Sequence, residues 1–242
     1  MANLDPRTGF APARSANATG VAYDEGLRSY MLSIYNYMAS AVLLTGGVAL
    51  AFAESGMALD LMTNGGILRW VVMLAPLGLV MWLSMGINRL SESSAKAIYW
   101  AYAVLMGLSL STILLVYTGG SVAKTFFAAS AAFGGLSLYG YTTKKDLSGF
   151  GTFLIMGVVG LIAASLLNIF LKSSSLDFAI SAIGVLLFAG LTAYDTQKIK
   201  LMYDQVGSSE MRGKAVIMGA LTLYLDFINL FLFLLRFMGD RR

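Results

Sequence analysis

Two aspartates lie where an acidic side chain is unfavourable. Asp226 lies near the middle of an apolar segment, residues 215–235, and Asp195 follows another apolar run, in the stretch GLTAYDTQKIK. An ionised aspartate at the centre of a bilayer costs about 2.5–3.5 kcal/mol on insertion scales, so such residues are normally kept for a function or held by a partner. The chemistry open to these two carboxyl groups is therefore the first question that the sequence raises.

Two carboxyl groups that meet away from water cannot both ionise at low cost, so the pair holds one shared proton. Loss of that proton makes the groups repel each other and leaves hard oxygen ligands, which suit Ca²⁺ better than soft metals do. If Asp195 and Asp226 meet, they would form a pH sensor and a Ca²⁺-binding site. Two alternatives stay open: Asp226 could simply join helices by hydrogen bonds, and Asp195 could be a solvated acid at a helix end.

Further polar residues lie near the two aspartates in the sequence. On a helix, Thr222 and Asn229 share the face of Asp226, because they lie four residues before it and three after it. Such a polar stripe should face a bundle interior or a water-filled path. Thr196 follows Asp195 directly. We expect these three polar side chains to support the pair.

Arg89 is the cation that could answer an ionised aspartate. It ends another apolar run, in MWLSMGINRLS, on the side of the membrane where we expect Asp195. Its guanidinium would act as a latch that pairs with a deprotonated carboxylate. The simpler interpretation is an arginine in an inside loop that follows the usual charge bias.

The composition indicates a membrane protein with several spans. Hydrophobic residues make up 57% of the 242 residues and charged residues only 12%, against roughly 25% charged in a soluble domain. The mean hydropathy is +0.73. Disorder is excluded, because it needs low hydrophobicity and high charge.

Missing residue types narrow the chemistry further. The chain has no cysteine and no histidine, which excludes disulfides, a thiolate nucleophile and the usual neutral-pH base. The net charge of +4 is interpreted as a topology signal, because no arginine-rich tract or nucleic-acid-binding motif is present. We predict no nucleic-acid partner and no bound cofactor.

Seven long apolar segments can be recognised, each separated by a short polar connection. A membrane helix needs about 20 mostly apolar residues, and the segments are too long and uniform for barrel strands. We predict an all-α membrane protein, a seven-helix bundle over residues 28–238, preceded by a flexible tail over residues 1–27. The segments are 29–53, 70–88, 97–123, 125–143, 147–171, 178–194 and 215–235.

The distribution of lysine and arginine favours a cytoplasmic N-terminus. With that orientation, 11 of these residues lie inside and 6 outside, as the positive-inside rule expects. The arginines of the C-terminal tail, Arg236, Arg241 and Arg242, fall outside if the last segment crosses fully. The sequence leaves the side of the C-terminus open.

Two stretches resemble the Bax inhibitor-1 family (transmembrane Bax inhibitor motif proteins), and more closely its bacterial branch. They are AGLTAYDTQKI at 189–199 and LTLYLDFINLF at 221–231. The resemblance implies seven helices with the last one at the centre, and a pH-sensitive Ca²⁺ leak through the bundle. It also implies that Asp195 pairs with Asp226 and that an arginine late in the second helix, matched by context to Arg89, acts as a latch.

We therefore expect a pH-sensitive Ca²⁺ leak channel of the inner (cell) membrane, and not an enzyme. The expected partners are the lipid bilayer, Ca²⁺ and a membrane protease or other membrane protein. The alternative is a non-conducting scaffold that regulates a membrane protease or a stress response. An intramembrane aspartyl protease would share the Tyr-Asp pair at 194–195. It would also need a Gly-x-Gly-Asp element, whereas this chain has Leu-Tyr-Leu-Asp at 223–226.

Overall fold

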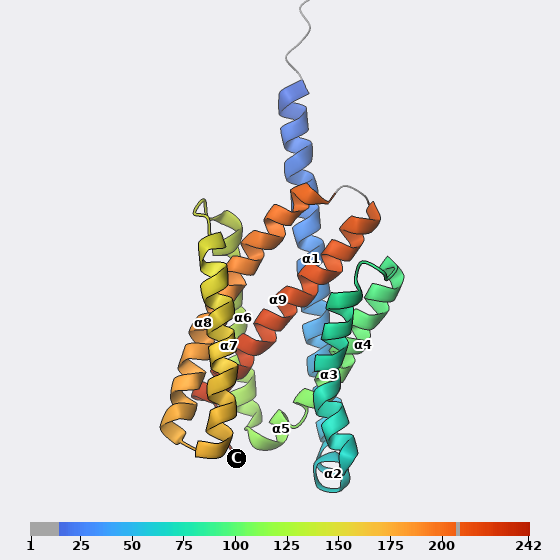
Figure 1. Ribbon diagram of the computed structural model, residues 1–242. Helices are drawn as coiled ribbons and strands as arrows, with labels where there is room; N and C mark the ends of the chain where they lie inside the picture. Colours follow the sequence, from blue (N-terminus) through green and yellow to red (C-terminus); the bar gives the residue numbers. More distant parts are fainter. Residues whose placement is uncertain (1–14, 207–208) are drawn as a thin grey trace, which may run out of the picture.

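The computed structural model describes residues 15–206 and 209–242, with side chains from residue 25 onward. The described chain is helical, apart from short connections and one isolated backbone bridge near the C-terminus. Figure 1 shows the helices as a bundle with two ends. The elements are α1 (Ser15–Glu54), α2 (Met57–Asn64), α3 (Ile67–Gly86), α4 (Glu92–Leu110), α5 (Ile113–Val116), α6 (Gly119–Thr142), α7 (Ser148–Leu171), α8 (Ser174–Met202), η1 (Tyr203–Gln205) and α9 (Ser209–Met238).

The predicted all-α membrane class is confirmed, and each of the seven predicted segments falls on helix. Within the described residues, six helices are long and apolar enough to cross a membrane. The predicted count of seven is therefore one too high by this criterion. The exception is α6, whose glycines and Lys124 lower its hydropathy. It still runs between the same two ends of the bundle as its neighbours (Figure 1).

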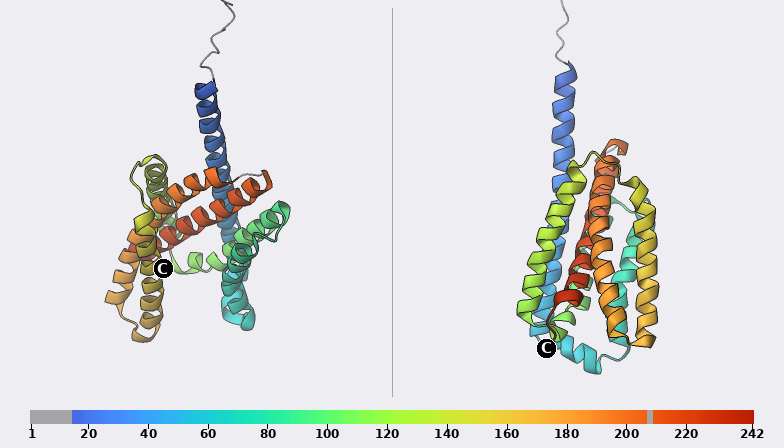
Figure 2. Two further views of the ribbon diagram at one scale, coloured as in Figure 1. Left: turned by 45° about the horizontal axis from the view of Figure 1, so that its top comes forward. Right: turned by 90° about the vertical axis from the view of Figure 1, so that its left-hand side faces the viewer.

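Helix α9 lies at the centre of the bundle, as the two further views show (Figure 2). It packs against α1, α4, α6 and α8. In its most apolar window, 67% of the residues are buried, compared with 11% in α3 and in α7. The last two helices lie at the periphery, where they expose their side chains to the surrounding lipid. A side chain on α9 is therefore the one best shielded from lipid and water.

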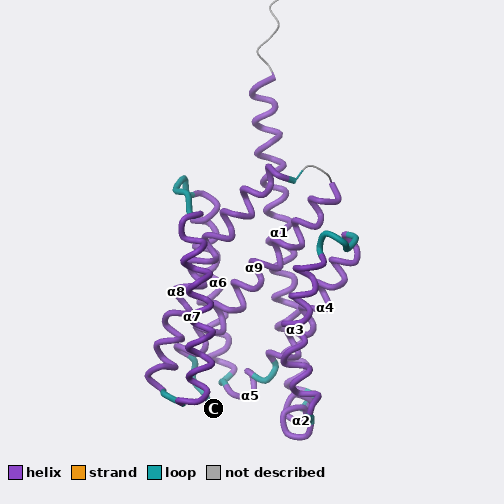
Figure 3. The backbone as a smooth tube through the Cα atoms, viewed as in Figure 1, coloured by secondary structure: helices purple, strands orange, loops and turns teal. Residues whose placement is uncertain are grey.

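The chain starts and finishes at opposite ends of the bundle (Figure 3). We call them the amino end, where α1 begins, and the carboxy end, where α9 ends. Helix α1 begins at Ser15, before the boundary predicted at residue 28. The first part of the predicted tail, residues 1–14, lies outside the described residues. Because α9 crosses fully, the C-terminus lies at the opposite end from the start of α1.

Close helix contacts fix the central packing. In a membrane, helices associate through van der Waals fit, which small residues allow. A Cβ atom on Gly140 of α6 would lie 2.3 Å from the backbone oxygen of Ala193 in α8. On the other side of α9, the Tyr224 hydroxyl lies 2.8 Å from Oγ1 of Thr45, which donates to the Ala103 carbonyl at 2.9 Å. This pair of bonds joins α9, α1 and α4.

The glycine at the α6–α8 contact gives a direct test of the packing. We expect Gly140→Ala to destabilise the protein by about 1–3 kcal/mol, because the added methyl meets backbone rather than a movable side chain. Gly134→Ala is the matched control on the same helix, where a Cβ meets nothing within 4 Å. Thermal unfolding in detergent should show a lower Tm for the first variant alone. Equal Tm values would contradict the tight α6–α8 contact.

Candidate functional site

The carboxyl groups of Asp195, from α8, and Asp226, from α9, are hydrogen-bonding neighbours inside the bundle. Asp226 is only 5% exposed, and its Oδ2 atom has no hydrogen-bond partner among the described residues. Asp195 is half-buried. Two acids that are far apart in the sequence thus meet at the packed interface of the two helices. We call this contact the aspartate pair.

The two aspartates meet because α8 continues well past Asp195. From Lys214 to Asp226 the last helix rises about 18 Å, which places Asp226 deep in the bundle. Helix α8 ends only at Met202, so Asp195 lies about 10 Å before the end of its own helix. The contact therefore lies within the bundle rather than at its surface.

The supporting polar side chains predicted from the sequence hydrogen-bond to their own helices. Thr222 Oγ1 donates to the Met218 carbonyl at 3.0 Å, and Asn229 Nδ2 donates to the Leu225 carbonyl at 2.8 Å. Such bonds from a side chain to the preceding turn are a common way to satisfy polar groups in a membrane helix. Asn229 also lines an apolar cavity of about 580 Å³ between α7, α8 and α9.

Thr196 joins α8 to α6. Its Oγ1 donates to the Thr192 carbonyl at 2.7 Å and lies 3.3 Å from the Ser137 hydroxyl of α6. Thr196 is fully buried. It therefore holds the turn of α8 that carries Asp195 against a neighbouring helix, while its hydroxyl points away from the carboxyl groups.

Arg89 is not brought to the aspartate pair. It lies in the turn after α3, its side chain is exposed, and it forms no ion pair with any described residue. The cation whose charge acts on Asp195 is instead Lys198, one turn along α8. In this structure the latch contact is absent from the described part of the chain.

Two side chains that follow Asp195 hold the connection between α6 and α7. Gln197 is clamped to this loop by two bonds of 2.8 Å: its Oε1 accepts from the Leu147 amide, and its Nε2 donates to the Lys145 carbonyl. Lys200 Nζ donates to the Tyr141 carbonyl at 2.8 Å. Sequence reasoning quoted this glutamine but gave it no role. The signal was a polar residue on the turn of helix that carries the aspartate.

The loop held by Gln197 contains an acid of ordinary behaviour. Hydrogen bonds from the Ser148 side chain and backbone lower the pKa of Asp146, which is fully exposed. The Ser148 amide donates to Asp146 Oδ1 at 2.9 Å. Asp146 therefore stays ionised through the physiological range and makes a natural comparison for the buried acids.

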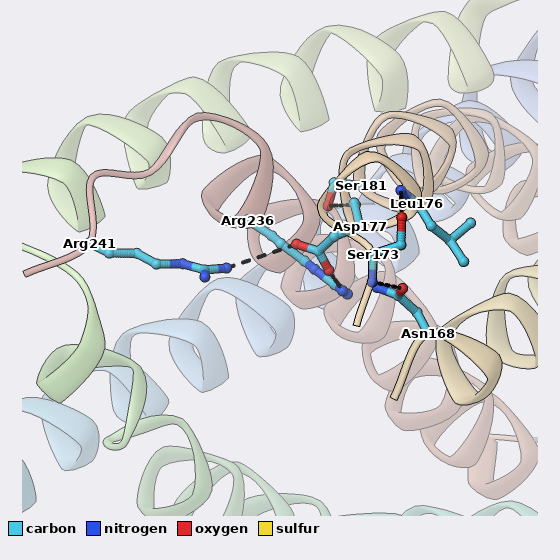
Figure 4. Close-up of polar contacts among 7 residues, drawn as sticks. All are labelled: Asn168, Ser173, Leu176, Asp177, Ser181, Arg236 and Arg241. Atoms are coloured by element: carbon cyan, nitrogen blue, oxygen red, sulfur yellow. Dashed lines mark hydrogen bonds and ion pairs between the residues drawn. The ribbon is translucent and has the colours of Figure 1, made fainter. Parts of the chain in front are cut away.

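At the carboxy end a second acid joins α8 to α9. Asp177, in the first turn of α8, forms an ion pair with Arg236 near the end of α9, and Arg241 lies 3.9 Å from its other carboxylate oxygen (Figure 4). Sequence reasoning treated these arginines only as exceptions to the charge bias. The ion pair shows how arginines are accommodated at the carboxy end.

The fold and the site define a multi-pass, all-α membrane protein with a buried carboxyl pair at its centre. The family model described as "Inhibitor of apoptosis-promoting Bax1" matches residues 27–242. The chain therefore belongs to the Bax inhibitor-1 family, as its Asp-Thr-Gln and Leu-Asp-Phe-Ile stretches predicted.

Similar proteins occur in several bacteria. The inner membrane protein YbhL of Escherichia coli K12 is 47% identical over 219 residues, which cover 90% of this chain and 94% of the relative. An uncharacterised protein of Rickettsia prowazekii is 53% identical over 220 residues, covering 91% and 93%. A protein of Caulobacter vibrioides is 46% identical over 247 residues, covering 98% and 99%. The relatives match this chain over nearly its whole length.

Removal of the Gln197 amide should release the α6–α7 loop. Gln197→Leu leaves the Leu147 amide and the Lys145 carbonyl without their partner, at about 1–3 kcal/mol for each buried group. Trypsin should then cut after Lys144 or Lys145 in the detergent-solubilised protein about tenfold faster or more, because each 1.4 kcal/mol is a factor of ten in the open population. Lys198→Gln, at the next, exposed position, is the control and should leave the cleavage rate unchanged. A Gln197→Leu protein cut at the wild-type rate would show that the loop does not depend on the clamp.

Proposed function

We propose that this protein is a pH-sensitive Ca²⁺ leak pathway of the inner membrane, with its N-terminus in the cytoplasm. In this proposal Asp195 and Asp226 are both the pH sensor and the site where the cation binds. The observation that supports it is the contact between two buried carboxyl groups on different helices of the bundle. No described base or metal cluster offers another titratable centre inside the bundle.

The direction of the pH response follows from the number of protons in each state. When α8 and α9 are in contact, the aspartate pair holds one proton. When the helices separate, both carboxylates are hydrated and hold none. Because the contact state binds more protons, a rise in pH favours separation, as proton linkage requires. The pathway should therefore be closed at low pH and open at higher pH.

The ligand set suits an ion in transit rather than a stored one. A tight Ca²⁺ site supplies six to eight oxygen ligands, whereas the pair supplies two carboxylates. The described residues contain no group of three or more acidic side chains that could hold a metal. An ion that binds weakly can also leave, which conduction requires. Asp226 Oδ2, which lacks a partner, is the oxygen that a passing cation would meet first.

Arg89 fits this scheme as a contact of the open state. It is exposed at the amino end of the bundle, on a turn after a helix that packs mainly on α4. A peripheral helix can move without disturbing the central packing. In our proposal Arg89 pairs with an aspartate only after the shared proton has left, which is why the contact is absent here.

Ca²⁺ uptake into dye-loaded proteoliposomes tests the proposal. We expect uptake by the wild type to rise between about pH 5 and pH 8. Asp226→Asn should give uptake that is low and independent of pH, because a neutral amide imitates the protonated partner at every pH. Asp195→Asn should behave in the same way.

Asp146→Asn is the matched control for this experiment. It removes one carboxylate at the amino end, where Asp146 is exposed and already ionised. Its pH profile should follow the wild type. If Asp226→Asn keeps the wild-type pH profile, the aspartate pair is not the sensor. If the wild type shows no uptake above empty liposomes at any pH, the protein does not conduct and acts as a scaffold instead.

A further inference from the structure

The last residues of the chain fasten α9 to its neighbours at the carboxy end. The backbone of residues 240–242 pairs with the start of α6: the Thr118 amide donates to the Asp240 carbonyl at 3.0 Å, and the Arg242 amide donates to the Val116 carbonyl at 2.9 Å. The Asp240 amide also donates to Ser121 Oγ at 2.9 Å. We call residues 236–242 and their contacts the C-terminal clasp.

Asp177 connects the C-terminal clasp to α8, and the local structure holds this acid in place. The Leu176 amide donates to Ser173 Oγ at 3.3 Å, and the Ser173 amide donates to Asn168 Oδ1 at 3.0 Å (Figure 4). These bonds fix the turn between α7 and α8. Asp177 then lies in the first turn of α8, where the helix dipole favours a negative charge. Its carboxylate reaches Arg236 of α9 from this fixed position.

Most of the contact between α8 and α9 has no direction of its own. Phe233 stacks on Phe188 with ring centroids 5.6 Å apart, and Phe178 lies against Phe237 at 5.1 Å. Apolar faces of this kind can slide past each other at small cost, because dispersion contacts are weak and not directional. Charged and hydrogen-bonded groups permit one alignment. Polar contacts join α8 to α9 at two depths: the aspartate pair and the Asp177–Arg236 ion pair.

We propose that the Asp177–Arg236 ion pair and the C-terminal clasp set the register of α9 against α8, and so hold Asp226 opposite Asp195. Asp177 and Arg236 are positioning residues that act through the aspartate pair. A helix rises by about 1.5 Å per residue and is stiff along its axis, so an alignment fixed at the carboxy end is kept at the depth of the aspartates. The functional meaning of this role rests on the proposed function, whereas the register can be measured without it.

The absence of native cysteine makes the register measurable. In the double variant Asp195→Cys, Asp226→Cys, the two thiols are the only ones in the chain. Mercuric ion, a soft metal that binds two thiolates, should bridge them and protect them from a maleimide reagent. We expect high protection with the clasp intact. We expect it to fall several-fold when Asp177→Asn is added, and to be restored with Asp177→Glu, which keeps the carboxylate.

Glu54→Gln provides the matched control. Glu54 is an exposed acid at the same end of the bundle and forms none of the ion pairs of the described residues. This variant removes the same charge and should leave thiol protection unchanged. If the Asp177→Asn protein aggregates on size exclusion, a chain that stops at Gly239 decides instead, because it removes the backbone pairing and keeps Asp177. We expect several-fold lower protection there as well.

Unchanged protection in a folded Asp177→Asn protein would overturn the proposal. An equal loss with Asp177→Glu would overturn it too, because the role assigned to Asp177 needs only its charge. These results are independent of ion conduction. A protein that shows no Ca²⁺ uptake but loses thiol protection with Asp177→Asn would refute the proposed function and leave the register role standing.

Discussion

The contact between the carboxyl groups of Asp195 and Asp226 is the interaction on which the rest of the arrangement depends. Two unit charges at contact repel far more strongly in a protein interior than in water, and Asp226 is almost completely shielded from water. A proton is therefore part of the packed structure, because α8 and α9 cannot keep this contact without it. The sequence, which has no histidine, achieves a proton-dependent contact through burial and proximity.

The fold surrounds this contact with fixed attachments. Towards the amino end, Thr196 and Gln197 join α8 to α6 and to the α6–α7 loop. At the carboxy end, Asp177 joins α8 to Arg236 of α9. Helix α9 is further bonded to α1 through the hydroxyl of Tyr224. A change at the aspartate pair therefore acts between two groups of helices that are each well anchored, which is a suitable arrangement for a two-state element.

The sequence predicts the helices well because each apolar run is long enough to define one. The meeting of Asp195 and Asp226 could be predicted only as a condition, because spacing within a segment says nothing about which segments touch. The same limit explains the Asp177–Arg236 ion pair, which no local pattern indicates. The start of α1 at Ser15 also differs from expectation, because residues 15–27 lack the apolar run used to recognise a helix.

Infrared titration tests the shared proton most directly. A protonated carboxylic acid has a carbonyl stretch that is well separated from the bands of an ionised carboxylate. We predict such a band in the wild-type protein at about pH 5, its loss as the pH rises towards about pH 8, and its absence from Asp226→Asn across that range. A wild-type protein without this band, or with a band that Asp226→Asn leaves unchanged, would contradict a proton shared between Asp195 and Asp226.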